Sequence, residues 1–212
     1  MKYVMKFLLL QIPLYGIGFG APIATQYVIP SFGAQYFLVV NPVVIDGKFL
    51  GVGKCYEIKD DGNFEKIWQI EGDYSFSNNL FLSREGNILI KIVDVYPTKD
   101  KADLEKKSAL EFYEKGKLVK RVNVADIVDP AKLEISSFPS DLPTYEIIKF
   151  DEPIVPKIGT LSYFDYFDEN DRDQINKKSK NGAQIFCIKT TQSEVLAFEV
   201  ADGSLIYRKK LK

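Results

Sequence analysis

Short apolar runs separated by glycine turns recur along this chain. In five places a charged residue and a glycine end an apolar or aromatic run, and the next apolar residue comes two positions after the glycine. The five units are Asp46-Gly47-Lys48-Phe49, Asp61-Gly62-Asn63-Phe64, Glu85-Gly86-Asn87-Ile88, Lys115-Gly116-Lys117-Leu118 and Asp202-Gly203-Ser204-Leu205. Glycine readily takes the positive φ that tight hairpin turns require, and strand-forming residues flank most of the units. The pattern predicts an all-β fold built mainly from antiparallel hairpins.

The segments on either side of three of these turns resemble one another. Each unit reads as an apolar stretch, a turn and a second apolar stretch, which is typical of a strand, a hairpin turn and another strand. The pairs are Cys55–Ile58 with Ile67–Ile70, Leu110–Tyr113 with Leu118–Val122, and Val195–Phe198 with Leu205–Arg208. We therefore expect hairpin repeats.

The pattern loosens between Asp126 and Asn181. Prolines interrupt this stretch at positions 130, 139, 143, 153 and 156, and each one removes a donor from a strand ladder. We expect long loops with short strands here. Two short helices are predicted, at Val124 to Val128 and at Glu169 to Lys178. The second has acidic residues at its start and Lys177 and Lys178 at its end, as the helix dipole favours.

The segment Val195–Arg208 resembles the hairpin of β-propeller blades of the quinoprotein type. Glu199 stands where the blade pattern has aspartate, and Tyr207 takes the aromatic position. More loosely, the order of hairpins resembles exported bacterial proteins of unknown function with propeller-like repeats. The resemblance implies a propeller-like fold of about four blades at roughly 40–45 residues each. A β-sandwich and an up-and-down barrel stay open as alternatives.

The N-terminal segment has the pattern of an export signal. Lys2 and Lys6 precede an apolar stretch, and the next charged residue is Asp46. We predict a signal peptide over residues 1–20, cleaved after Gly20, and a single β-rich domain over residues 21–212. The protein is then secreted or periplasmic. An uncleaved membrane anchor and a buried N-terminal strand are the alternatives, and contact with a membrane is expected only through this segment.

Charge and composition exclude several classes of function. The chain has 28 Lys and Arg against 29 Asp and Glu, a formal net charge of -1, so no basic excess is present to neutralise nucleic-acid phosphates. It contains no histidine. This excludes Ser-His-Asp and Cys-His nucleophiles and His-ligated zinc. We expect no nucleic-acid partner and no cofactor.

One acidic cluster is a candidate cation site. It comprises Asp165, Asp168, Glu169, Asp171 and Asp173, with Asn170 among them. Closely spaced carboxylates suit calcium, but the register of a calcium-binding EF-hand loop fails, because Asp173 takes the glycine position and Ser179 the position of the bidentate glutamate. We interpret the cluster as a solvated helix start and predict no metal site.

Cys55 and Cys187 are the two cysteines of the chain. Neither belongs to a C-x-x-C pair, so a dithiol redox site is excluded. Export would allow a disulfide between them, and two unrelated buried thiols are the alternative.

No set of residues forms a catalytic motif, and we assign no catalytic residue. The sequence predicts an exported, non-catalytic binding or interaction protein with a protein or carbohydrate ligand. A carboxylate-driven hydrolase acting on carbohydrate is the alternative, because paired carboxylates need no histidine. Trp68 and most of the other aromatic residues are expected to pack in the core.

Overall fold

The described part of the chain consists mainly of strands. The computed structural model describes residues 26–31, 33–45, 48–72, 80–93, 105–129, 167–180, 183–190 and 192–211. Eleven strands and two short helices lie in these ranges, and every strand pairing is antiparallel. The predicted all-β class is confirmed. The predicted signal peptide and most of the predicted loop region between Asp126 and Asn181 lie outside the described residues.

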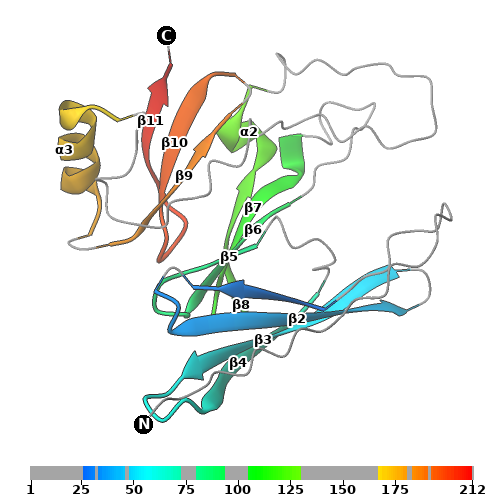
Figure 1. The fold of residues 1–212 in the computed structure, drawn as a ribbon. Helices are drawn as coiled ribbons and strands as arrows, with labels where there is room; N and C mark the ends of the chain where they lie inside the picture. Colours follow the sequence, from blue (N-terminus) through cyan, green and yellow to red (C-terminus); the bar gives the residue numbers. More distant parts are fainter. Residues whose placement is uncertain are drawn as a thin grey trace, which may run out of the picture.

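The strands form three sheets that follow one another along the chain (Figure 1). The first sheet holds β1 (Tyr27–Pro30), β2 (Tyr36–Ile45), β3 (Lys48–Ile58) and β4 (Phe64–Gly72). The second holds β5 (Leu80–Leu82), β6 (Ile88–Ile92), β7 (Ser108–Glu114) and β8 (Lys117–Asn123). The third holds β9 (Ile185–Lys189), β10 (Glu194–Glu199) and β11 (Leu205–Lys210). Strands adjacent in sequence are adjacent in space, so each sheet is a meander.

Glycine turns join the strands where the sequence predicts them. Gly62, Gly86, Gly116 and Gly203 all have positive φ angles, between 66° and 82°. The fifth turn, at Asp46-Gly47, lies outside the described residues, but the strands on either side of it pair from Ile45 and Lys48. The three pairs of similar segments form the last two strands of the three sheets, which are β3–β4, β7–β8 and β10–β11.

The sheets pack on one another in chain order, with the second between the other two (Figure 1). Side chains alternate between the two faces of a strand, so Leu89 faces the first sheet while Ile88 and Ile90 face the third. α3 (Glu169–Lys178) covers the far face of the third sheet, where Ile175 of the helix packs in one cluster with Cys187 and Val195 of the sheet. Three packed sheets differ from the two sheets of a sandwich and from the single closed sheet of a barrel.

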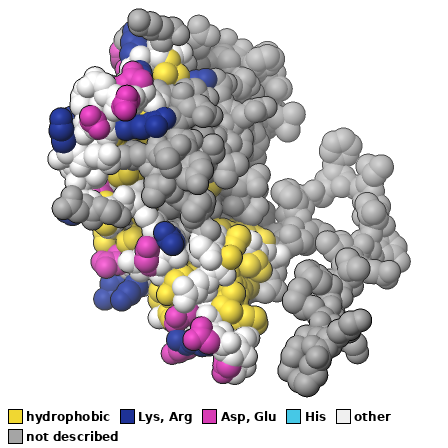
Figure 2. All heavy atoms as spheres, turned by 60° about the vertical axis from the view of Figure 1, so that its left-hand side comes forward, with side chains coloured by type: hydrophobic (Ala, Val, Ile, Leu, Met, Phe, Trp, Pro, Cys, Tyr) yellow, Lys and Arg dark blue, Asp and Glu magenta, His cyan; other side chains and the backbone are white. Residues whose placement is uncertain are grey.

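The three apolar clusters leave out the outer face of the first sheet, which is the face turned away from the second sheet. Several large apolar side chains of this sheet are exposed, among them Val28 and Phe64. Figure 2 shows hydrophobic side chains gathered at the surface over the part of the molecule that the first sheet forms.

The turn between β5 and β6 ties the second sheet to the first. A Cβ atom at Gly86 would lie 2.4 Å from Cγ of Tyr36, so only glycine allows this approach. The Gly86 carbonyl accepts hydrogen bonds from Nε1 of Trp68 at 2.7 Å and from Sγ of Cys55 at 3.5 Å. Trp68 is 7% exposed. Its packing in the core is confirmed, and its buried N–H has the partner that burial demands.

Both predicted helices are present. The first, α2 (Val124–Ile127), ends one residue before the predicted boundary, and α3 has the predicted bounds. The backbone N–H of Asn123 donates to the Asp126 carboxylate at 2.9 Å at the start of α2. Neither helix of the described residues is long and apolar enough to cross a membrane.

Candidate functional site

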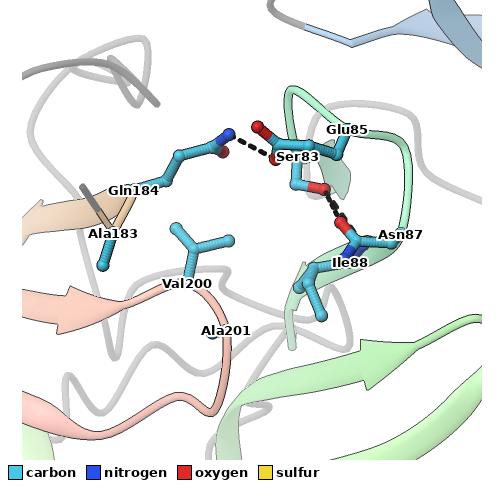
Figure 3. A pocket seen from close by; sticks show the side chains of 8 residues that line it. All are labelled: Ser83, Glu85, Asn87, Ile88, Ala183, Gln184, Val200 and Ala201. Atoms are coloured by element: carbon cyan, nitrogen blue, oxygen red, sulfur yellow. Dashed lines mark hydrogen bonds between the residues drawn. The ribbon is translucent and has the colours of Figure 1, made fainter. Parts of the chain in front are cut away.

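A groove of about 210 Å³ lies between the second and third sheets (Figure 3). One wall is the turn between β5 and β6. The other is formed by the residues just before β9 and the turn after β10, so the groove opens at the junction of two sheets that are distant in sequence. Its lining residues are Ser83, Glu85, Asn87, Ile88, Ala183, Gln184, Val200 and Ala201.

Hydrogen bonds fix the Asn87 side chain at the edge of this groove. The Ser83 hydroxyl accepts from the backbone N–H of Ile88 at 3.0 Å and donates to Oδ1 of Asn87 at 2.9 Å. This hydrogen bond engages the carbonyl oxygen of the Asn87 amide. The other end of the amide is therefore Nδ2, which is the donor that Asn87 offers to a ligand.

A polar bridge joins the two walls. Nε2 of Gln184 donates to Oε2 of Glu85 at 2.5 Å (Figure 3). Oε1 of Gln184 accepts from the backbone N–H of Arg84 at 3.1 Å. Both hydrogen bonds are exposed to solvent, where such contacts contribute little stability. A ligand that offers Glu85 another donor can displace Gln184 at small cost.

The inner surface of the groove is apolar. Ile88 and Val200 are almost fully buried and belong to the cluster between the second and third sheets. Among the eight lining residues none is aromatic, and Glu85 is the one carboxylate. Glycoside hydrolysis by the usual mechanism needs two carboxyl groups flanking the bond. The groove therefore gives the hydrolase alternative no support.

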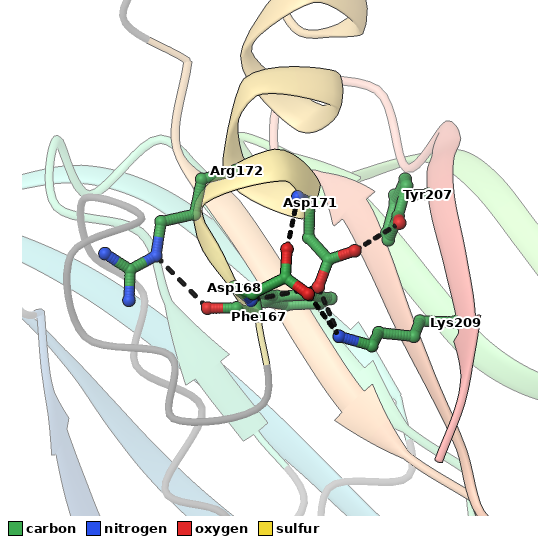
Figure 4. Close-up of polar contacts among 6 residues, drawn as sticks. All are labelled: Phe167, Asp168, Asp171, Arg172, Tyr207 and Lys209. Carbon is green, nitrogen blue, oxygen red and sulfur yellow. Dashed lines mark hydrogen bonds and ion pairs between the residues drawn. The ribbon is translucent and has the colours of Figure 1, made fainter. Parts of the chain in front are cut away.

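The acidic cluster at α3 serves to start the helix and anchor it to β11 (Figure 4). Asp168 accepts from the backbone N–H of Asp171 at 3.0 Å, and its own N–H donates to Oδ2 of Asp171 at 2.9 Å. Oδ1 of Asp171 accepts from the Tyr207 hydroxyl at 2.7 Å, and Oδ2 also accepts from Nζ of Lys209. The carboxylate of Asp171 is thus fully engaged inside the protein.

This arrangement corrects part of the interpretation of the cluster. Asp168, Glu169 and Asp173 are exposed, as expected for a solvated helix start, but Asp171 is only 5% exposed. Burial alone raises the pKa of the Asp171 carboxyl, whereas hydrogen bonds from Lys209 and Tyr207 outweigh burial and hold the pKa below its ordinary value. Asp165 lies outside the described residues. Within the described ranges, no three acidic or cysteine side chains are grouped so as to hold a metal ion.

We predict that Asp171→Asn destabilises the protein at neutral pH by about 1–3 kcal/mol, because a buried charged hydrogen bond is lost. A carboxyl whose pKa is lowered by folding stabilises the folded state above its unfolded pKa and loses that contribution as the pH falls through the folded pKa. The difference between wild type and variant should therefore shrink below about pH 4. Urea unfolding across pH measures this. The exposed Asp173→Asn, on the same helix, is the control and should change stability little at any pH.

The two cysteines are free and buried. Cys55 lies in the cluster between the first and second sheets, whereas Cys187 lies in the cluster under α3. The second and third sheets separate these clusters, so the interpretation as two unrelated buried thiols is confirmed. Burial raises the pKa of the Cys55 thiol to about 12 and raises the pKa of Cys187 as well, so neither is a reactive thiolate.

Sequence reasoning identified Glu85 and Asn87 only as parts of a turn, and it missed Ser83 and Gln184. The local sequence carries a signal for the fixed Asn87 side chain, because Ser83 and Asn87 lie four residues apart on either side of the turn at Gly86. No local signal marks Gln184, because its hydrogen bond to Glu85 joins residues 99 positions apart. Comparison of the chain with protein-family models gives no match, and comparison with curated proteins gives none either.

Proposed function

We propose that this protein is a non-catalytic binding protein that holds an extended peptide segment of a partner protein in the groove between its second and third sheets. One observation carries the proposal: the fixed amide of Asn87 and the carboxylate of Glu85 stand beside the apolar surface of Ile88 and Val200. These are a donor, an acceptor and an apolar contact within one small groove. Binding sites typically combine a few placed polar groups with an apolar lining.

A peptide bond matches these groups. Each non-proline residue offers a carbonyl acceptor and an N–H donor. Nδ2 of Asn87 would donate to the carbonyl, and the Glu85 carboxylate would accept from the N–H after Gln184 moves aside. The side chain of the bound residue would then pack on Ala183 and Ala201, the lining alanines that keep some exposure, above the nearly buried Ile88 and Val200. A small apolar side chain fits this description best.

The same features favour peptide over carbohydrate. Sugar rings stack on aromatic planes, which combine apolar area with a polar handle, and the described groove lining has none. The groove volume of about 210 Å³ is also below the roughly 300–1,000 Å³ of sites that enclose a drug-sized ligand. It suits one peptide residue and its neighbouring amide groups.

The scaffold of this binding protein, in our proposal, is propeller-like. Each similar pair of segments in the sequence forms the last hairpin of one meander, so the repeat in sequence corresponds to one sheet in space. The blades of a propeller are likewise successive antiparallel meanders that pack on one another. Export of the protein stays a prediction, because it rests on residues 1–20.

We predict that random peptides displayed on phage enrich on the immobilised full chain and lose binding when the groove is altered. Asn87→Ala should lower the affinity for a selected peptide by up to about tenfold, which corresponds to the loss of one hydrogen bond of about 1.4 kcal/mol. Ala201→Trp should abolish binding, because position 201 is exposed and lines the groove, so the indole fills it without disturbing the core. Titration calorimetry with a synthetic copy of the selected peptide measures both effects.

The turn between β3 and β4 supplies matched controls. Its Asp61-Gly62-Asn63 segment repeats the pattern of Glu85-Gly86-Asn87, but Asn63 is exposed and lines no described groove. Asn63→Ala and Asn63→Trp should leave peptide affinity unchanged. Selected peptides that bind Ala201→Trp as tightly as wild type would count against the groove as the site.

A further inference from the structure

The outer face of the first sheet carries a cluster of three aromatic side chains, of which Phe64 is exposed and Phe37 and Tyr56 are half-buried. Phe37, Tyr56 and Phe64 come from β2, β3 and β4, and Val28 of β1 extends the same face. Phe64 is 64% exposed and Val28 57%. None of the four belongs to the apolar clusters that hold the sheets together. In Figure 2 hydrophobic side chains form the surface over this sheet.

The three aromatic rings pack against one another. Phe37 and Tyr56 are stacked at 5.3 Å with an angle of 16° between their planes, and Phe64 meets Phe37 edge to face at 5.2 Å. Neighbouring rings on one sheet can stack in this way only if they stand upright on it. They therefore present edges to solvent, which suits interdigitation with the side chains of another sheet. Flat stacking of a sugar or a nucleobase is not favoured.

At the opposite end of the three packed sheets, the outer face is covered by a helix. α3 covers the third sheet with a helix whose outward residues are polar, including Asn170, Asp173 and Lys177. Stacked repeats need such polar caps at their ends to stay soluble. The first sheet has no comparable cap among the described residues, and its outer face has the character of an interface between sheets.

Residues of opposite charge lie on the two sides of the aromatic cluster, which would allow two copies of this face to pair them. Lys54 lies on one side of the aromatic cluster, in the row of Val39 and Gln69. On the other side the strands end in the acidic turn at Asp60 and Asp61. Lys54 and Asp60 are each three residues from Glu57 along β3 and the turn that follows. Consider a two-fold axis that runs parallel to the sheet and perpendicular to its strands, at the level of Glu57. It would place each Lys54 over the partner copy's acidic turn.

The area allows a weak dimer. The nine residues of β4 at about 3.3 Å each and four strands about 4.8 Å apart give about 500 Å² per copy, with β1 shorter than the rest. Two copies would bury about 1,000 Å², which is the lower limit for a specific interface. We propose that two copies of this protein associate through the outer faces of their first sheets, about a two-fold axis through the aromatic cluster, in a reversible dimer.

Sedimentation equilibrium of the full chain over a range of concentrations tests this proposal. We expect a concentration-dependent dimer that Phe64→Asp weakens at least tenfold, because it places a carboxylate against the ring of Phe37 within the aromatic cluster. Leu205→Asp is the matched control. Leu205 is also an exposed apolar strand residue, at 42%, but it lies in the third sheet, and its substitution should leave association unchanged.

A charge swap distinguishes a second copy from any other partner. Lys54→Glu and Asp60→Lys should each weaken the dimer, and the double variant should recover most of the lost affinity, because the new pair re-forms across the axis. A chain that stays monomeric at every concentration overturns the proposal, including one that instead binds lipid vesicles through this face. Dimers unaffected by Phe64→Asp overturn it as well. Neither result bears on the groove.

Discussion

Gly116→Ala is expected to destabilise the protein by about 3–5 kcal/mol, from backbone strain together with overpacking against a neighbouring sheet. Gly116 has φ +82° in the turn between β7 and β8, where an alanine is strained. Its Cβ would also lie 2.3 Å from the backbone oxygen of Gln69 in β4. A backbone atom cannot rotate away as a side chain can, so the first and second sheets would have to move apart. Urea unfolding followed by the fluorescence of Trp68, the single tryptophan, measures the loss.

Gly62→Ala separates the two causes. Gly62 has nearly the same φ, +81°, but a Cβ there meets nothing within 4 Å. This variant should lose only the conformational contribution, about 1 kcal/mol. If both variants lost the same stability, the close approach of the second sheet to β4 would not exist in solution.

The features predicted correctly from the sequence are those that short stretches of chain determine. A turn needs a residue that accepts positive φ, and Gly62, Gly86, Gly116 and Gly203 all occupy such positions. The bounds of α3 follow from its ends in the same way. Asp168 caps the first turn, and Lys177 and Lys178 lie in the last.

The features that sequence reasoning missed depend on contacts between distant residues. Asp171 looks like its neighbours in the acidic cluster, and only the fold brings Tyr207 and Lys209 to it. The groove forms because the turn between β5 and β6 lies beside Gln184 of the third sheet. Hydrophobic periodicity reveals which face of a strand is buried, but it does not reveal which sheet buries that face.

Phe112→Ala is expected to destabilise the protein by about 3–5 kcal/mol, as usual when a buried aromatic side chain is truncated. Phe112 is fully buried in the cluster between the second and third sheets. Its ring lies 6.4 Å from that of Phe186 and 6.1 Å from that of Phe198, one in β9 and one in β10. Truncation leaves a cavity that both sheets border. Chemical denaturation of the variant measures the loss.

A milder pair of substitutions shows whether this cluster joins the two sheets. Phe112→Leu and Phe198→Leu should each cost about 1–2 kcal/mol and should be coupled in the double variant by about 0.5 kcal/mol or more, because the two rings are in contact. Phe112→Leu combined with Leu38→Ala is the control, since Leu38 lies in the cluster between the first and second sheets. Those two losses should simply add. Coupling in the control but not in the aromatic pair would contradict the packing order of the sheets. It would also count against the groove, because its two walls belong to the sheets that these rings join.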